Sequence, residues 1–227
     1  MGSLGSNCPH EFELGKRLMP TEEDLKSMLE QSWALDTDLA ALMEALPPPT
    51  TSRQAIVRGM CTTSHSHYHS QRVLIEVGTT PTALALVRLH YESVVRSLWY
   101  AAGATEDWID RMKLENSKEN GEPVLGPPVD SMLNRLAEVA PPHLSASLRA
   151  LRDATWKPMN SFVHGGIHAI LTGLLDLNTP YQWIGVLKNA NGLATMNAQA
   201  LLISCNDPRS VGRLAVVQQK HLKCLPA

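Results

Sequence analysis

Proline clusters divide this sequence into segments whose apolar residues recur at helical spacing. After Pro20, leucines and methionines recur every three or four residues until Pro47-Pro48-Pro49 prevents a helix from continuing. Thr21, followed by three acidic residues, is typical of a helix N-terminus, because it caps unpaired N–H groups and places negative charge at the positive helix end. A helix is therefore predicted from Thr21 to about Leu46.

The remainder of the chain repeats this pattern without alternating strands, an internal repeat or a glycine-rich phosphate loop. Pro158 is expected to separate two helices, with Asn160 or Ser161 capping the second. The sequence predicts an all-α fold, an antiparallel helical bundle with additional helices. Its further helices are expected over about 52–77, from Pro81 to beyond Leu98, and over about 106–115, 130–139, 144–156, 162–175, 180–204 and 209–221.

Length and composition favour one domain. A flexible tail is predicted over residues 1–20 and a single helical domain over 21–227, because 44% hydrophobic residues can fill one large core. No secretion signal or long uninterrupted apolar stretch occurs, so we expect a soluble cytoplasmic protein with no membrane partner. The net charge of −2 supplies no general attraction to nucleic acid, so such a partner would need a local basic patch.

Three charged residues follow one stripe of the predicted helix after Pro81. Arg88, Glu92 and Arg96 are spaced four residues apart, beside the apolar positions that include Tyr91. They would form either one wall of a polar cleft or an ion-pair ladder on a solvated face, which needs no ligand. The apolar surroundings leave both interpretations open.

The segment from Trp156 to His168, WKPMNSFVHGGIH, is the most informative stretch of the chain. Asn160 and His164 are one helical turn apart, and the two glycines that follow permit close backbone approach. A ligand or a second helix could use the space beside Asn160 and His164. The candidate ligand-binding residues are Trp156, Lys157, Ser161 and Tyr91.

Two histidine pairs have the spacing of helical metal ligands. His164 precedes His168 by four residues, and His65 precedes His69 by the same interval. Neither pair has an evident third ligand or the glutamate of a zinc protease motif. Packing or surface histidines are the favoured interpretation, and no metal or cofactor is predicted.

Three segments resemble bacterial helical proteins of unknown function related to the HEPN (higher eukaryotes and prokaryotes nucleotide-binding) fold. They are residues 86–96, LVRLHYESVVR, residues 156–168, and residues 187–193, LKNANGL. The resemblance extends over roughly 52–226. It implies a helical bundle that commonly forms a homodimer, and in many members a metal-independent ribonuclease with a composite site of Arg, a polar residue and His.

The resemblance implies that His164 is an acid/base or phosphate contact and that Asn160 is its polar partner. The sequence departs from the family pattern where an arginine is expected shortly before the histidine, because Lys157, Pro158 and Met159 occupy those positions. Lys157 supplies charge without a bidentate fork. Arg88 or Arg96 would have to supply the guanidinium from the neighbouring helix, with Glu92 orienting it.

Two functional hypotheses follow. The first is an RNA-acting toxin or defence effector with a composite dimer site, where the RNA 2′-hydroxyl attacks, His164 transfers a proton and an arginine stabilises phosphate charge. The second is a non-catalytic helical module that binds a nucleotide, a small ligand or a partner protein. Under the first hypothesis an operon-encoded protein partner is also expected.

Overall fold

The computed structural model describes residues 19–112, 126–175, 179–206 and 208–226, and in these ranges the chain is all-α, with no strand. The predicted tail up to residue 18 and the end of the predicted 106–115 helix lie outside the described residues. The elements are α1 (Glu22–Glu44), α2 (Ser52–Glu76), α3 (Thr80–Ala102), α4 (Glu106–Arg111), α6 (Val129–Val139), α7 (Pro142–Val163), α8 (Ile167–Leu175), α9 (Pro180–Cys205), α10 (Pro208–Lys220) and the 3₁₀ turn η1 (Leu222–Cys224).

The N-terminus of α1 has the predicted capping. Thr21 accepts a hydrogen bond from the backbone N–H of Asp24, and the Asp24 carboxylate accepts one from the backbone N–H of Thr21. This reciprocal arrangement satisfies two amide groups that the helix itself leaves unpaired. The capping prediction is therefore confirmed.

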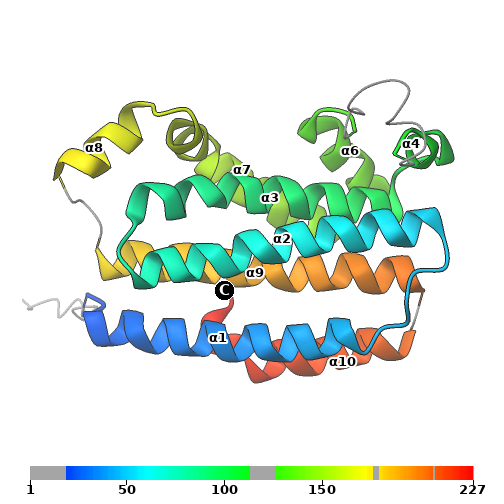
Figure 1. Cartoon of the computed structure of the whole chain (residues 1–227), viewed down its shortest axis with the longest axis horizontal. Coiled ribbons are helices and arrows are strands. Elements are labelled where there is room, and N and C mark those ends of the chain that lie inside the picture. Colours follow the sequence, from blue (N-terminus) through cyan, green and yellow to red (C-terminus); the bar gives the residue numbers. More distant parts are fainter. Residues whose placement is uncertain (1–18, 113–125, 176–178, 207, 227) are drawn as a thin grey trace, which may run out of the picture.

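The long helices lie side by side in layers (Figure 1). Helices α2, α3 and α9 pack against one another in the middle, with α1 and α10 on one side and α7 with α6 on the other. The core they enclose is apolar and includes the fully buried Leu35, Val57, Val94, Leu98 and Leu187. None of the described helices combines the length and the apolarity that crossing a membrane requires.

The predicted helix break at Pro158 is wrong. Helix α7 continues through Pro158 to Val163, so Asn160 lies inside α7 and does not cap a new helix. Pro158 lacks the backbone N–H that would otherwise donate to the carbonyl of Ala154. Because Ala154 is exposed, water can hydrogen-bond to this carbonyl instead. The buried Met159 packs in the core on the next position and holds the helix in place.

The actual break comes at His164-Gly165-Gly166. His164 is the C-cap of α7, and Gly165 adopts a φ of 64°, a left-handed conformation that favours glycine. A Cβ added to Gly166 would lie 2.6 Å from the Ser161 Oγ, so glycine is also needed there for close approach. Together the glycines turn the chain into α8, which extends the α7 side of the molecule (Figure 1).

Candidate functional site

The charged stripe on α3 forms a linked ion-pair ladder. Glu92 accepts a hydrogen bond from Arg88 Nε at 2.7 Å through Oε1, and one from Arg96 Nη1 at 2.9 Å through Oε2. The side chain of Glu92 is 15% exposed and those of the two arginines 22% and 25%. The ladder is therefore half-buried, unlike a fully solvated surface pair.

The ladder keeps Glu92 ionised. Burial by itself would raise the pKa of this carboxyl group, but the hydrogen bonds from Arg88 and Arg96 outweigh burial and hold the pKa below its usual value. A charged Glu92 in turn holds both guanidinium groups in fixed orientations. With two positive groups and one negative, the ladder retains one net positive charge.

Arg88 joins the ladder to α7. Its Nη1 donates a hydrogen bond to Asn160 Oδ1 at 2.5 Å and lies 3.3 Å from His164 Nε2. A guanidinium has no acceptor, so the contact with His164 is a hydrogen bond only when Nε2 is unprotonated and Nδ1 carries the proton. The structure thus brings together Arg88, Glu92, Asn160 and His164, all of which were predicted site residues.

Trp156 and Arg152 lie beside this group. The guanidinium carbon of Arg88 is 4.9 Å from the centre of the Trp156 ring, and that of Arg152 is 5.4 Å from it. Arg152 also pairs with Asp130 on α6. Arg152 was not singled out in the sequence, because its spacing from Arg88 reveals nothing about their shared contact with one aromatic ring.

The other predicted ligand-binding residues, Lys157, Ser161 and Tyr91, lie in three different parts of the structure. Lys157 is exposed on α7. Ser161 links α7 to α8, because its hydroxyl accepts a hydrogen bond from the His168 backbone N–H at 2.9 Å. Tyr91 is fully buried and its hydroxyl donates to the Leu148 carbonyl at 3.0 Å, so it belongs to the core between α3 and α7.

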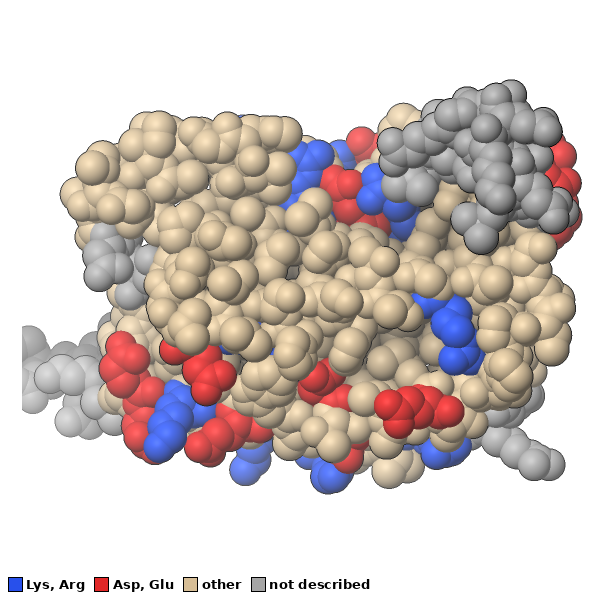
Figure 2. Space-filling model, viewed as in Figure 1, with Lys and Arg blue, Asp and Glu red and all other residues tan. Residues whose placement is uncertain are grey.

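The surface over this region is hollowed. Figure 2 shows a depression on the side of α3, between the α7–α8 region and the opposite end of the molecule, with basic and acidic side chains alternating at its base. The side chains of Arg88, Glu92 and Arg96 are partly exposed and His164 is exposed, so a charged ligand can approach them.

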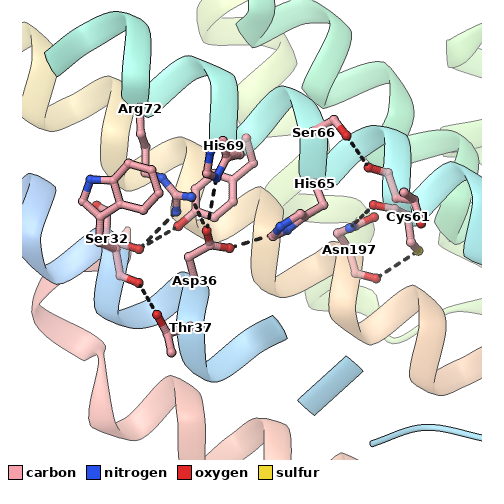
Figure 3. A network of polar contacts seen from close by, with 12 residues as sticks. Ser32, Asp36, Thr37, Cys61, His65, Ser66, His69, Arg72 and Asn197 are labelled. Carbon is pink, nitrogen blue, oxygen red and sulfur yellow. Dashed lines mark hydrogen bonds and ion pairs between the residues drawn. The ribbon is translucent and has the colours of Figure 1, made fainter. Parts of the chain in front are cut away.

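A second polar cluster lies between α1 and α2 (Figure 3). The fully buried Arg72 pairs with Asp36 Oδ2, and its guanidinium carbon lies 4.2 Å from the ring centre of Trp33 and 3.8 Å from that of Tyr68. Asp36 also faces both histidines of one predicted pair. Its Oδ1 is 3.5 Å from His65 Nδ1, and its Oδ2 is 3.8 Å from His69 Nδ1.

These positions bear on the predicted histidine pairs. The break after α7 places His164 and His168 on different helices, so they are not ligands on successive turns of one helix. His65 and His69 do share a face of α2, with Asp36 between them. Within the described ranges, no group of three or more His, Cys, Asp or Glu side chains is arranged to hold a metal ion.

The fold and the site together define an all-helical protein with a polar, half-buried site between α3 and α7. Residues 61–227 match the model of a family of unknown function, DUF6988, and the chain belongs to this family. The matched region contains every predicted site residue on α3 and α7, whereas α1 precedes it. No curated protein and no solved structure matches the chain.

Proposed function

We propose that this protein is a HEPN-like, metal-independent endoribonuclease whose site is built from Arg88, Asn160 and His164. The observation that carries the proposal is the position of the Arg88 guanidinium, which reaches both Asn160 and His164 from another helix. The arginine that the HEPN pattern expects in the segment before His164 is thereby supplied by α3. The HEPN relation itself rests on the sequence resemblance.

The charges of the site suit an RNA phosphate. Arg88 and Arg96 provide two guanidinium groups against the single carboxylate of Glu92, and guanidinium groups bind phosphate oxygens through paired N–H donors. The chain as a whole carries a net charge of −2. Binding would therefore depend on this local patch, and would weaken steeply as salt rises.

The reaction we propose uses the RNA as its own nucleophile. The 2′-oxygen forms a bond to phosphorus, the bond from phosphorus to the 5′-oxygen breaks, and a 2′,3′-cyclic phosphate and a 5′-hydroxyl result. Unprotonated His164 Nε2 accepts the proton of the 2′-hydroxyl, and a protonated imidazole donates one to the leaving 5′-oxygen. Arg88 stabilises the charge that develops on the phosphate oxygens.

A homodimer would supply the second imidazole, from His164 of the other copy. Helix α8 begins at Ile167, three residues after His164, and none of its residues is buried. Several of its aliphatic side chains are exposed, as is Val163; those on α8 are Ile167, Ile170, Leu171, Leu174 and Leu175. Exposed apolar surface of this kind is typical of protein interfaces. We propose that α8 is the dimer contact and that the composite site forms beside it, in a cytoplasmic toxin or defence effector.

The specific test is RNA cleavage in EDTA by purified wild-type protein and by the His164→Ala variant. His143→Ala is the matched control, because His143 is an exposed histidine on the same helix. We expect cleavage by wild type and His143→Ala, none by His164→Ala, and equal helicity of all three by circular dichroism. The ribonuclease proposal is rejected if folded wild-type protein leaves RNA intact both as a monomer and at high protein concentration.

One observation favours a second candidate function, a non-catalytic binding module. Arg88 already donates to Glu92 through Nε and to Asn160 through Nη1, so two of its nitrogens are engaged without a substrate. In this case the depression would bind a nucleotide, a small ligand or a partner protein without reaction. Binding of a non-cleavable RNA with 2′-O-methyl groups, together with no cleavage of ordinary RNA, is the result that would select this candidate.

A further inference from the structure

A pocket of about 240 Å³ lies between α1, α2 and α9, away from the Arg88 site on the α7 side of α3 (Figure 1). Pockets for drug-sized ligands usually have about 300–1,000 Å³, so this one suits a smaller molecule. Part of its wall is apolar and comes from Ala40, Met43 and Leu201. The wall would therefore accommodate a short aliphatic group.

The pocket also carries charges of opposite sign on facing helices. Glu44 lies on α1 and Arg58 on α2. In the described part of the chain Glu44 has no ion-pair partner. Arg58 donates one hydrogen bond, from Nη2 to the Pro47 carbonyl at 2.6 Å. The carboxylate and most of the guanidinium donors remain available to a ligand.

His65 is another polar group of the pocket, and it lies beside the buried cluster of Figure 3. Its Nδ1 faces Asp36 Oδ1 at 3.5 Å, and Asp36 is in turn held by the fully buried Arg72. A proton on Nδ1 leaves Nε2 as the ring atom that can contact a ligand.

The pocket is suited to binding rather than to nucleophilic chemistry. The thiol of Cys61 is its best nucleophile by type, but burial raises the pKa of this thiol to about 12. A thiol in that state is not ionised at neutral pH. What the pocket offers is one negative group, one positive group, one imidazole and an aliphatic wall.

We propose that this pocket binds a small zwitterion, a free amino acid with an aliphatic side chain. Its ammonium group pairs with Glu44, its carboxylate with Arg58, and its side chain packs against Met43 and Leu201. Glu44 and Arg58, which would meet the two charges of the ligand, have no ion-pair partner among the described residues, and Arg58 donates only to the Pro47 carbonyl there. This proposal does not depend on ribonuclease activity.

The test is calorimetric titration of the full chain with three matched probes. They are L-leucine, 4-methylpentanoate, which lacks the ammonium group, and 3-methylbutylamine, which lacks the carboxylate. We expect leucine to bind at least tenfold more tightly than either analogue. The proposal is overturned if leucine gives no heat of binding, or if all three probes bind with equal affinity.

Two charge-removing variants assign the contacts. Glu44→Gln should lower the affinity for leucine about tenfold and leave the affinity for 4-methylpentanoate unchanged, since a tenfold change corresponds to one modest charge contact. Arg58→Gln should lower the affinity for leucine and leave the affinity for 3-methylbutylamine unchanged. Glu23→Gln and Arg213→Gln, at exposed positions, are the controls. The proposal would also be overturned if both pocket variants are folded by circular dichroism and bind leucine with unchanged affinity.

Discussion

Arg88 Nη1 lies 3.3 Å from His164 Nε2, although the two residues are 76 positions apart in the chain. The contact crosses from the middle of α3 to the C-cap of α7, and the same nitrogen donates to Asn160 one turn earlier. Because Glu92 fixes the other edge of the guanidinium, Arg88 is held by contacts on both sides.

Replacing Arg88 by lysine should lower RNA cleavage by about 10²-fold, the usual cost of losing one positioned donor in a transition state. Lysine keeps the charge but cannot donate to Glu92 and Asn160 in the geometry of a planar fork. Initial rates of cleavage in EDTA measure the effect. Arg135→Lys, on an exposed pair with Glu138, should keep the wild-type rate; equal rates for both variants would contradict a role for the Arg88 fork.

Removing the Asp36 carboxylate should destabilise the protein strongly. Asp36→Ala leaves the fully buried Arg72 without its counter-charge, which typically costs about 3–5 kcal/mol of unfolding free energy. Urea denaturation followed by circular dichroism measures the loss. The exposed pair of Lys220 and Asp38 gives the control, because Lys220→Ala should cost about 1 kcal/mol or less.

The double variant Asp36→Leu with Arg72→Met sharpens this test. Both charges are then absent, so no buried charge remains unpaired, and most of the stability lost in Asp36→Ala should return. A double variant as unstable as Asp36→Ala would show that shape, rather than the unpaired charge, dominates at this position.

Stability should fall on mild acidification because of His90. Burial lowers the pKa of this histidine from 6.5 to about 3, and neither ring nitrogen has a hydrogen-bond partner in the described structure. Since the folded pKa is below the unfolded one, the unfolded state binds the proton first. His90 therefore favours the folded state fully above pH 6.5, and this contribution is lost as pH falls from 6.5 toward 3.

The slope from this one group should approach about 1 kcal/mol per pH unit in the upper part of that window. Urea denaturation of wild type and His90→Phe, at several pH values above the range in which carboxylates titrate, isolates the contribution of His90. The His90→Phe curve should be flatter between pH 6 and pH 5, about where histidine alone titrates. Parallel curves for the two proteins would refute the assignment.

Gly165→Ala should destabilise the junction of α7 and α8. The φ of 64° at Gly165 costs an L-residue about 1 kcal/mol, although open space surrounds the position. Gly173→Ala is a suitable control, since it lies inside α8 with nothing within 4 Å of an added Cβ. Thermal unfolding should show a lower midpoint for Gly165→Ala and an unchanged or higher one for Gly173→Ala.

Much of the fold could be predicted from local sequence signals. The proline cluster after Leu46 and the threonine cap at Thr21 mark the ends of α1, and apolar spacing located the other described helices. Pro158 is the exception. The proline rule predicts a break, yet packing of Met159 and exposure of Ala154 let α7 continue, so that tertiary contacts outweigh a local preference.

Sequence alone sufficed to predict the all-α class and to place Arg88, Glu92 and Arg96 on one stripe of a helix, because helix formation and four-residue spacing depend only on neighbours along the chain. The contact of Arg88 with His164, and the position of Asp36 between Arg72 and His65, could not be predicted from the sequence. Those contacts join residues on different helices. They depend on how the helices pack, and packing is set by the whole core rather than by any one segment.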